Sequence, residues 1–212
     1  MQRLLVLLFL LLTALPILAA DLSLLQQWTF RVLLDGKDIG LHTFSLHKTA
    51  DVTHVTSTAR FDVKVLFFNA YQYIHEAQEV WRADCLSGMT ARTNDNGRLL
   101  SVNVVEHATG MVVTTDQKQF GLSGCVMSFA YWNPGILRQS QLLNAQTGEY
   151  EQVTVQLLRT TTLHVAGKEW AARQYKLKGR KLDIDLWYSL EGEWLALEST
   201  TENGSRLRYV LS

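Results

Sequence analysis

The sequence predicts an all-β, mainly antiparallel protein whose sheet is strongly curved into a barrel or half-open barrel, with at most one short helix. After residue 22, apolar residues recur at every second position through most of the chain, which is the period of a half-buried strand. Clusters of Gly, Asn and Asp interrupt this alternation at short intervals, as turns between antiparallel strands do. Long helical periodicity is scarce, so the sheet itself must curve to bury its apolar face.

The first twenty residues are typical of an export signal. Arg3 precedes the apolar run of residues 4–12, and Ala19 and Ala20 supply the small residues of a cleavage site. An uncleaved anchor is the alternative, because the apolar stretch is near the lower limit for a membrane span. We expect a signal peptide over residues 1–20, and no membrane span after its cleavage.

The remaining chain, residues 21–212, is expected to form a single antiparallel β domain in the periplasm of a Gram-negative bacterium. Removing the signal peptide, whose one charged residue is Arg3, leaves 19 basic and 20 acidic side chains. This near-neutral balance argues against a nucleic-acid partner, which would require a basic surplus. A chain of this size is large enough to bury one substantial core.

Alternation and turn residues define the expected strands in order. Asp35 and Gly36 turn the chain after the first strand, and residues 94–97 form a turn of the kind that closes hairpins. Glu191-Gly192 and Asn203-Gly204 mark later turns. The expected strands cover residues 28–34, 39–48, 52–67, 71–82, 85–93, 98–107, 110–117, 125–132, 150–165, 170–178, 182–190, 194–201 and 206–211.

Three of these segments need a separate argument. Residues 71–82 fit either a helix or a strand, and the neighbouring hairpin pattern favours a strand. Pro134 is the only proline after the signal peptide, and Asn133 before it predicts the cap of a short helix extending to about Leu143. Residues 182–190 show the cleanest one-sided apolar face, so their opposite face is expected to be in water.

The two cysteines, Cys85 and Cys125, predict a structural disulfide. An exported protein meets oxidising conditions, and only one intramolecular pairing is possible. A nucleophilic cysteine is the alternative, but neither residue lies in a recognisable reactive motif.

Several short motifs give the chain a family resemblance that covers essentially all of the mature protein. They lie at residues 34–40, 63–66, 70–73, 129–134, 142–148, 186–188 and 194–198. The chain resembles a bacterial family of exported proteins, the domain of unknown function family 6134. The resemblance implies a Gram-negative, periplasmic protein, and it carries no activity or catalytic residues.

Aromatic side chains are the candidate ligand-binding residues. Aromatic rings with polar tips suit the mouth of a cavity, and the interior of a curved sheet is a place for an apolar or lipid-like small molecule. Core and rim packing is the alternative role for these rings. The candidates are Tyr71, Tyr73, Trp81, Tyr131 and Trp132.

Motifs for catalysis or metal binding are weak, so neither a cofactor nor a metal ion is predicted. The six histidines are dispersed, and none is paired at the two-residue spacing that shares a strand face. Asp183 and Asp185 share one face about 7 Å apart, a separation that inverting glycosidases also use, but charged residues on a wet face explain them equally. An interaction module of the cell envelope and an envelope hydrolase using Asp183 and Asp185 remain alternatives to ligand binding.

Overall fold

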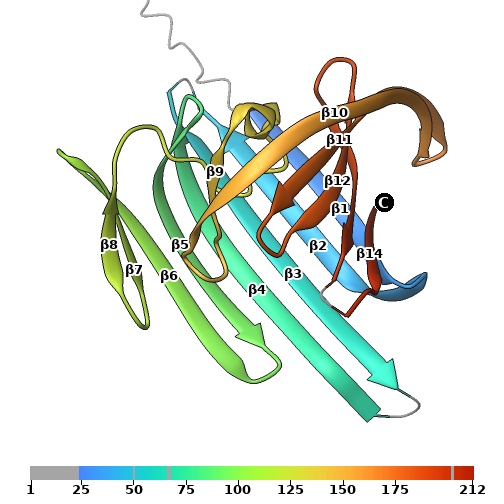
Figure 1. Ribbon diagram of the computed structural model, residues 1–212, viewed down its shortest axis with the longest axis horizontal. Helices are drawn as coiled ribbons and strands as arrows, with labels where there is room; N and C mark the ends of the chain where they lie inside the picture. Colours follow the sequence, from blue (N-terminus) through green and yellow to red (C-terminus); the bar gives the residue numbers. More distant parts are fainter. Residues whose placement is uncertain (1–23, 50, 66–67, 202) are drawn as a thin grey trace, which may run out of the picture.

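The computed structural model describes residues 24–49, 51–65, 68–201 and 203–212 (Figure 1). The predicted signal peptide lies outside the described residues, as does Phe67 of the third predicted strand. The described elements are β1 (Leu24–Leu34), β2 (Lys37–Lys48), β3 (Thr53–Val65), β4 (Phe68–Arg82), β5 (Cys85–Asp95), β6 (Arg98–His107), β7 (Gly110–Thr115), β8 (Gln119–Leu122), η1 (Pro134–Arg138), β9 (Gln141–Leu143), β10 (Tyr150–Val165), β11 (Lys168–Gly179), β12 (Asp183–Ser189), β13 (Trp194–Thr200) and β14 (Arg206–Leu211).

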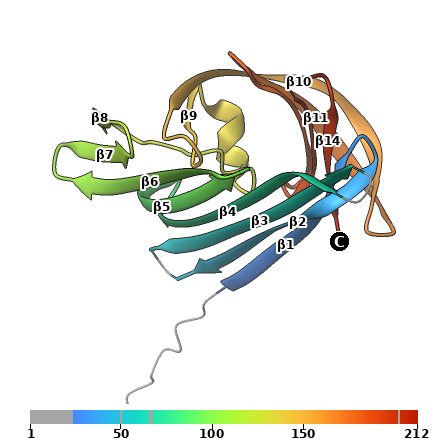
Figure 2. The ribbon, with the colours of Figure 1, turned by 90° about the horizontal axis from the view of Figure 1, so that it is seen from below.

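The fourteen strands of the described residues form one antiparallel sheet. Their order is β8-β7-β6-β5-β4-β3-β2-β1-β14-β13-β12-β11-β10-β9. The first half of the chain therefore runs outward from the central β1–β14 pair, and the second half runs from the other edge, at β9, back to that pair. Figure 2 shows the sheet bending round until β10 and β11 arch above β2 to β6. The prediction of an all-β, strongly curved antiparallel sheet is confirmed.

Residues 123–149, which we call the inner segment, cross the concave side of the sheet. Here the prediction of a strand over residues 125–132 is wrong: only Ser128 makes an isolated bridge, to Leu143. Val126 and Met127 are both buried, because a segment inside the curve is covered on both sides and needs no alternating pattern. The amide of Leu86 donates to the Val126 carbonyl, and the amide of Leu143 donates to the Met127 carbonyl.

The predicted short helix is shorter than expected. Its start is correct, because Asn133 caps it with a side-chain oxygen that accepts from the Gly135 amide at 2.8 Å. The helix is a 3-10 turn that ends at Arg138, not at Leu143. Residues 141–143 form β9 instead, because their backbone pairs with the start of β10.

Two further predictions need correction along the sheet. The four-residue strand β8 was missed because it is too short to show alternation. The outer face of β12 is not fully wet: Trp187 is buried there in a small second cluster with Val165 and Leu195. Val165, near the tip of the β10–β11 hairpin, packs in this cluster and covers the part of the face around Trp187, whereas Asp183 on the same face is partly exposed. Residues 71–82, by contrast, lie in β4 as predicted, paired with β3 and β5.

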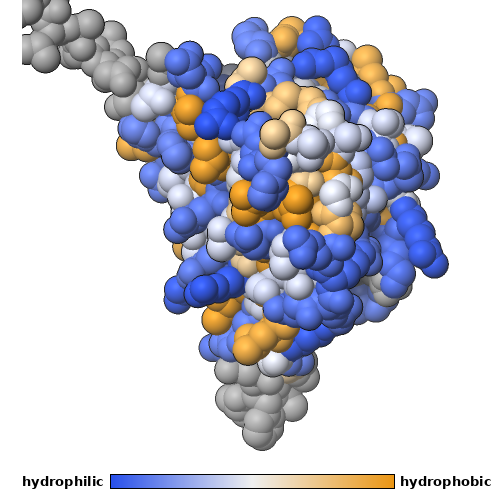
Figure 3. Space-filling model, turned by 90° about the vertical axis from the view of Figure 1, so that its left-hand side faces the viewer, coloured by the Kyte–Doolittle hydropathy of each residue, from blue (hydrophilic) through white to orange (hydrophobic). Residues whose placement is uncertain are grey.

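The main core lies between the concave face of the sheet and the inner segment. Trp81, Trp194 and Tyr188 are its largest fully buried side chains. Seen from the side where β7 and β8 lie, apolar residues stand in several groups between hydrophilic ones (Figure 3).

The predicted disulfide is confirmed between Cys85 and Cys125. Cys85 is the first residue of β5, and Cys125 lies near the start of the inner segment. The bond therefore fixes one end of the inner segment to the sheet.

Gly40 in β2 is required by its backbone conformation. Its φ of +141° is rarely adopted by other residues, and an added Cβ would collide with the Arg60 carbonyl of β3. We expect Gly40→Ala to lower the free energy of unfolding by about 2 kcal/mol, measured by urea denaturation. Gly121→Ala is the control, because the nearest atom to its Cβ would be 3.9 Å away. Equal stability of the two variants would contradict this role of Gly40.

Candidate functional site

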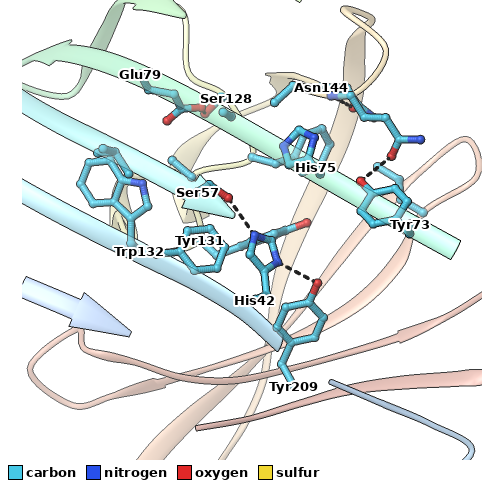
Figure 4. A pocket seen from close by; sticks show the side chains of 18 residues that line it. His42, Ser57, Tyr73, His75, Glu79, Ser128, Tyr131, Trp132, Asn144 and Tyr209 are labelled. Atoms are coloured by element: carbon cyan, nitrogen blue, oxygen red, sulfur yellow. Dashed lines mark hydrogen bonds between the residues drawn. The ribbon is translucent and has the colours of Figure 1, made fainter. Parts of the chain in front are cut away.

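A cavity of about 220 Å³ lies between the concave face of the sheet and the inner segment. Figure 4 shows the side chains that surround it. Strands β2, β3, β4 and β14 supply one side, and the inner segment supplies the other. The lining residues are His42, Phe44, Val55, Ser57, Tyr73, His75, Ala77, Glu79, Ser128, Phe129, Ala130, Tyr131, Trp132, Asn144, Ala145, Gln146, Leu182 and Tyr209.

Small side chains on β3 and β4 create the space. Ser57 and Ala77 pair in register and lie in one row with Phe44 of β2. Registered neighbours on one face of a sheet stand side by side, so two small residues in a row leave a hollow next to the Phe44 ring. In the next row, Ala59 separates His42 from His75.

His42 is held by hydrogen bonds at both ring nitrogens. Nδ1 lies 3.1 Å from the Tyr209 hydroxyl of β14, and Nε2 lies 2.7 Å from the Ser57 hydroxyl. Its ring also stacks on Phe44, with centroids 4.1 Å apart. Burial lowers the pKa of His42 to about 3, with nearby His75 adding to the effect, so the imidazole is neutral at pH 7.

His75 is a second neutral imidazole in the same cavity. Its Nδ1 lies 2.8 Å from the Thr93 hydroxyl of β5. Burial lowers the pKa of His75 to about 4, although Glu76 opposes this shift. Both histidines are therefore uncharged at neutral pH.

Glu79 is a buried carboxyl group at the other end of the cavity. The Trp81 indole donates to its Oε2 at 2.9 Å, and the Ser128 hydroxyl donates to its Oε1 at 2.8 Å. Burial raises the pKa of Glu79, and the two hydrogen bonds partly offset this rise. The ion pairs of the described residues do not include Glu79.

The structure brings three of the five candidate aromatic residues to the cavity. Tyr73, Tyr131 and Trp132 line it, and the Tyr73 hydroxyl donates to Gln146 at 3.1 Å. Trp81 lies behind Trp132 as a fully buried ring in edge-to-face contact, with centroids 5.3 Å apart. Tyr71 is not among the lining residues, and its hydroxyl donates to Asp95 at 2.6 Å.

Most polar residues of this cavity were not predicted from the sequence, and four of them are His42, Ser57, Glu79 and Tyr209. Glu79 had a usable signal, because it shares the strand face of Tyr73 and Ala77 through the two-residue period. The other three had none, since they come from different strands that only the folded sheet brings together.

Asp183 and Asp185 lie on the opposite, convex face of the sheet, away from the cavity. Lys176 of β11 bridges them, with its Nζ 2.6 Å from an oxygen of each. The hydrogen bond from the lysine lowers the pKa of Asp183, which favours the ionised form of that carboxyl. The structure therefore gives the two carboxylates an ion-pairing role between strands.

Two other kinds of feature are absent from the described part of the chain. Its His, Cys, Asp and Glu side chains form no group of three or more suited to a metal ion. Its helical content includes no segment long and apolar enough to cross a bilayer.

These features define a β-barrel-like protein in which a curved sheet and a crossing segment enclose a mixed aromatic and polar cavity. The chain belongs to the domain of unknown function family DUF6134, which matches residues 30–212, and this confirms the resemblance seen in the sequence motifs.

A solved structure shares the fold. It is a β-barrel-like protein of domain of unknown function DUF1849 from Brucella abortus, with a TM-score of 0.64 and 9% sequence identity over 88% of this chain and 94% of that chain. At this identity the likeness concerns the fold alone. The curated proteins include no match to this chain.

Proposed function

We propose that this protein is exported to the periplasm and binds a small amphipathic molecule in the cavity inside its curved sheet. The observation that carries the proposal is the cavity itself, which combines aromatic walls with convergent polar groups, as ligand sites do. The disulfide and the signal-like residues 1–20 support export.

The size of the cavity limits the ligand. Its volume of about 220 Å³ is below the roughly 300 to 1,000 Å³ of sites for drug-sized molecules. A small molecule therefore fits better than a complete long acyl chain, which would enter only by one end. The sequence predicted a lipid-like ligand, and the volume of the cavity limits the proposed ligand class to compact amphipathic compounds.

Trp132 supports a ligand that has a polar atom as well as an apolar body. Its Nε1 is a buried donor without a hydrogen-bond partner in the described structure, and an unsatisfied buried donor is costly. In Figure 4 this nitrogen lies on the side of the indole nearer Ser57 and Tyr131. An acceptor atom of a bound ligand would satisfy it.

The two alternatives have less support. An envelope scaffold would be expected to pack its interior solid, whereas this interior contains a cavity. A hydrolase based on Asp183 and Asp185 would have to work on the convex face, where Lys176 occupies the space between the two carboxylates.

Filling the cavity tests the proposal. We expect Ala77→Leu to weaken binding of 1-hexanol at least tenfold, because the larger side chain occupies the space between β4 and the inner segment. Gln78→Leu introduces the same leucine side chain on the exposed face of the same strand, and this variant should bind like the wild type. Ligand-observed NMR measures the dissociation constants, and native mass spectrometry of periplasmic protein detects a retained natural ligand.

The proposal would be wrong if wild-type protein isolated from its own periplasm carries no ligand and 1-hexanol neither binds nor raises its melting temperature. Equal binding by the Ala77→Leu and wild-type proteins would place the ligand elsewhere.

A further inference from the structure

The side chains that line the cavity include an acidic group but no basic one, and this balance indicates the charge of the ligand. Glu79 is the one acidic residue among the lining residues described, and none of those residues is a lysine or an arginine. Both lining histidines are neutral at pH 7. No fixed positive charge is therefore present to receive an anionic ligand.

Glu79 itself is arranged as an acceptor on both oxygens. The indole of Trp81 and the hydroxyl of Ser128 each donate to a different oxygen, a pattern that favours the ionised carboxylate. Its burial opposes ionisation, because a buried charge without a partner is strongly destabilised. A cation placed in the cavity would supply the missing partner.

The aromatic residues near Glu79 suit a cationic group as well. Trp132 packs against Trp81, the residue that donates to Glu79, so the carboxyl and the Trp132 ring border the same end of the cavity. Tyr131 adds a second ring. Faces of Trp and Tyr attract ammonium groups, with larger effects where water is excluded.

We propose that the ligand of this cavity is an organic ammonium ion that also carries a hydrogen-bond acceptor. Its charged group pairs with the Glu79 carboxylate, its acceptor atom meets the Trp132 indole N–H, and its apolar body lies against Phe44 and Tyr131. This inference rests on the proposed function, since it assumes that the cavity is a ligand site. It excludes fatty acids and phosphorylated small molecules, whose charge would face Glu79 in a site without a fixed cation.

Three probes of nearly equal shape separate charge from size: hexylammonium, 1-hexanol and hexanoate. We expect the wild-type protein at pH 7 to bind hexylammonium at least tenfold more tightly than 1-hexanol, and hexanoate more weakly than 1-hexanol. Isothermal titration calorimetry or ligand-observed NMR gives the three dissociation constants.

The Glu79→Gln variant tests the residue. Gln keeps the shape and can still accept from Trp81 while donating to the Ser128 hydroxyl. We expect hexylammonium affinity to fall at least tenfold, so that the preference for hexylammonium over 1-hexanol is lost. Glu76→Gln is the matched control, because Glu76 is an exposed residue on the opposite face, near Arg60.

The outcomes distinguish the two proposals. If 1-hexanol binds and hexylammonium binds no more tightly, the ammonium inference is overturned while the cavity remains a ligand site. If none of the three probes binds, the cavity is not a ligand site for such molecules, and the proposed function is contradicted together with the ammonium inference that rests on it. Should Glu79→Gln not fold, the comparison of the three probes on the wild-type protein alone decides the question.

Discussion

Acidification from pH 7 to pH 5 is expected to lower the free energy of unfolding by about 4 kcal/mol through two buried histidines, about 2 kcal/mol for each. The folded-state pKa of His42 is about 3 and that of His75 about 4, against 6.5 for the free side chain. In this pH range the unfolded chain therefore binds more protons than the folded one. The stabilisation is complete above pH 6.5 and is lost as the pH falls towards these folded-state values.

The surroundings of the two histidines determine the sign of this effect. His42 faces the hydroxyls of Tyr209 and Ser57, and His75 lies near it as a further destabilising influence on its charged form. Glu76 favours the charged form of His75 only weakly, because burial is the larger cause. Glu79 acts in the opposite direction: its pKa is raised in the folded protein, so its protonation offsets part of the loss on acidification.

Single substitutions separate these contributions. His42→Gln is expected to reduce the difference in unfolding free energy between pH 7 and pH 5 by about 2 kcal/mol, and His75→Gln should do the same. Urea denaturation at both pH values measures this difference, with the exposed His107→Gln as the control. A pH dependence in His42→Gln equal to that of the wild type would contradict the neutral, buried state of His42.

Loss of the disulfide is expected to have an effect of similar size. Cys85 and Cys125 are 40 positions apart, and a crosslink that closes such a loop stabilises a protein by about 4 kcal/mol in the chain-entropy description. The double variant Cys85→Ser and Cys125→Ser should therefore unfold at a clearly lower denaturant concentration. Denaturation of the oxidised wild type, the reduced wild type and the variant provides the measurement.

The position of the bond adds a local expectation. Amide hydrogen exchange at Leu86, which donates to the Val126 carbonyl, should become faster in the double variant, because the start of the inner segment loses its covalent attachment. Amides in the centre of β12 serve as the reference. If the double variant had the same free energy of unfolding as the oxidised wild type, the predicted stabilisation by the disulfide would be wrong.

Local patterns in the sequence were sufficient for most of the sheet. The two-residue period and the turn at residues 94–97 correctly placed β5 and β6 on either side. The two-residue alternation gave wrong predictions where a segment is not a strand with one buried and one exposed face. Val126 and Met127 are adjacent yet both buried, and Trp187 is covered by Val165 near the tip of the β10–β11 hairpin.

The cavity could be anticipated only in part. Tyr73, Tyr131 and Trp132 were identifiable because aromatic residues with polar tips stand out in a sequence. The contact between His42 and Tyr209 joins positions 167 residues apart, and it depends on the pairing of β1 with β14. No local spacing reports such a contact, so His42 was assigned no role before the fold was known.

The pairing of β1 with β14 has a consequence for how the chain reaches this state. In the middle of the sheet, the first strand of the chain pairs with the last. The two halves of the sheet, β1 to β8 and β9 to β14, can therefore form separately, but they join only after β14 is available. Non-local pairing of this kind makes folding slow. A chain with such a central pair completes its sheet only when its last strand is available to join its first.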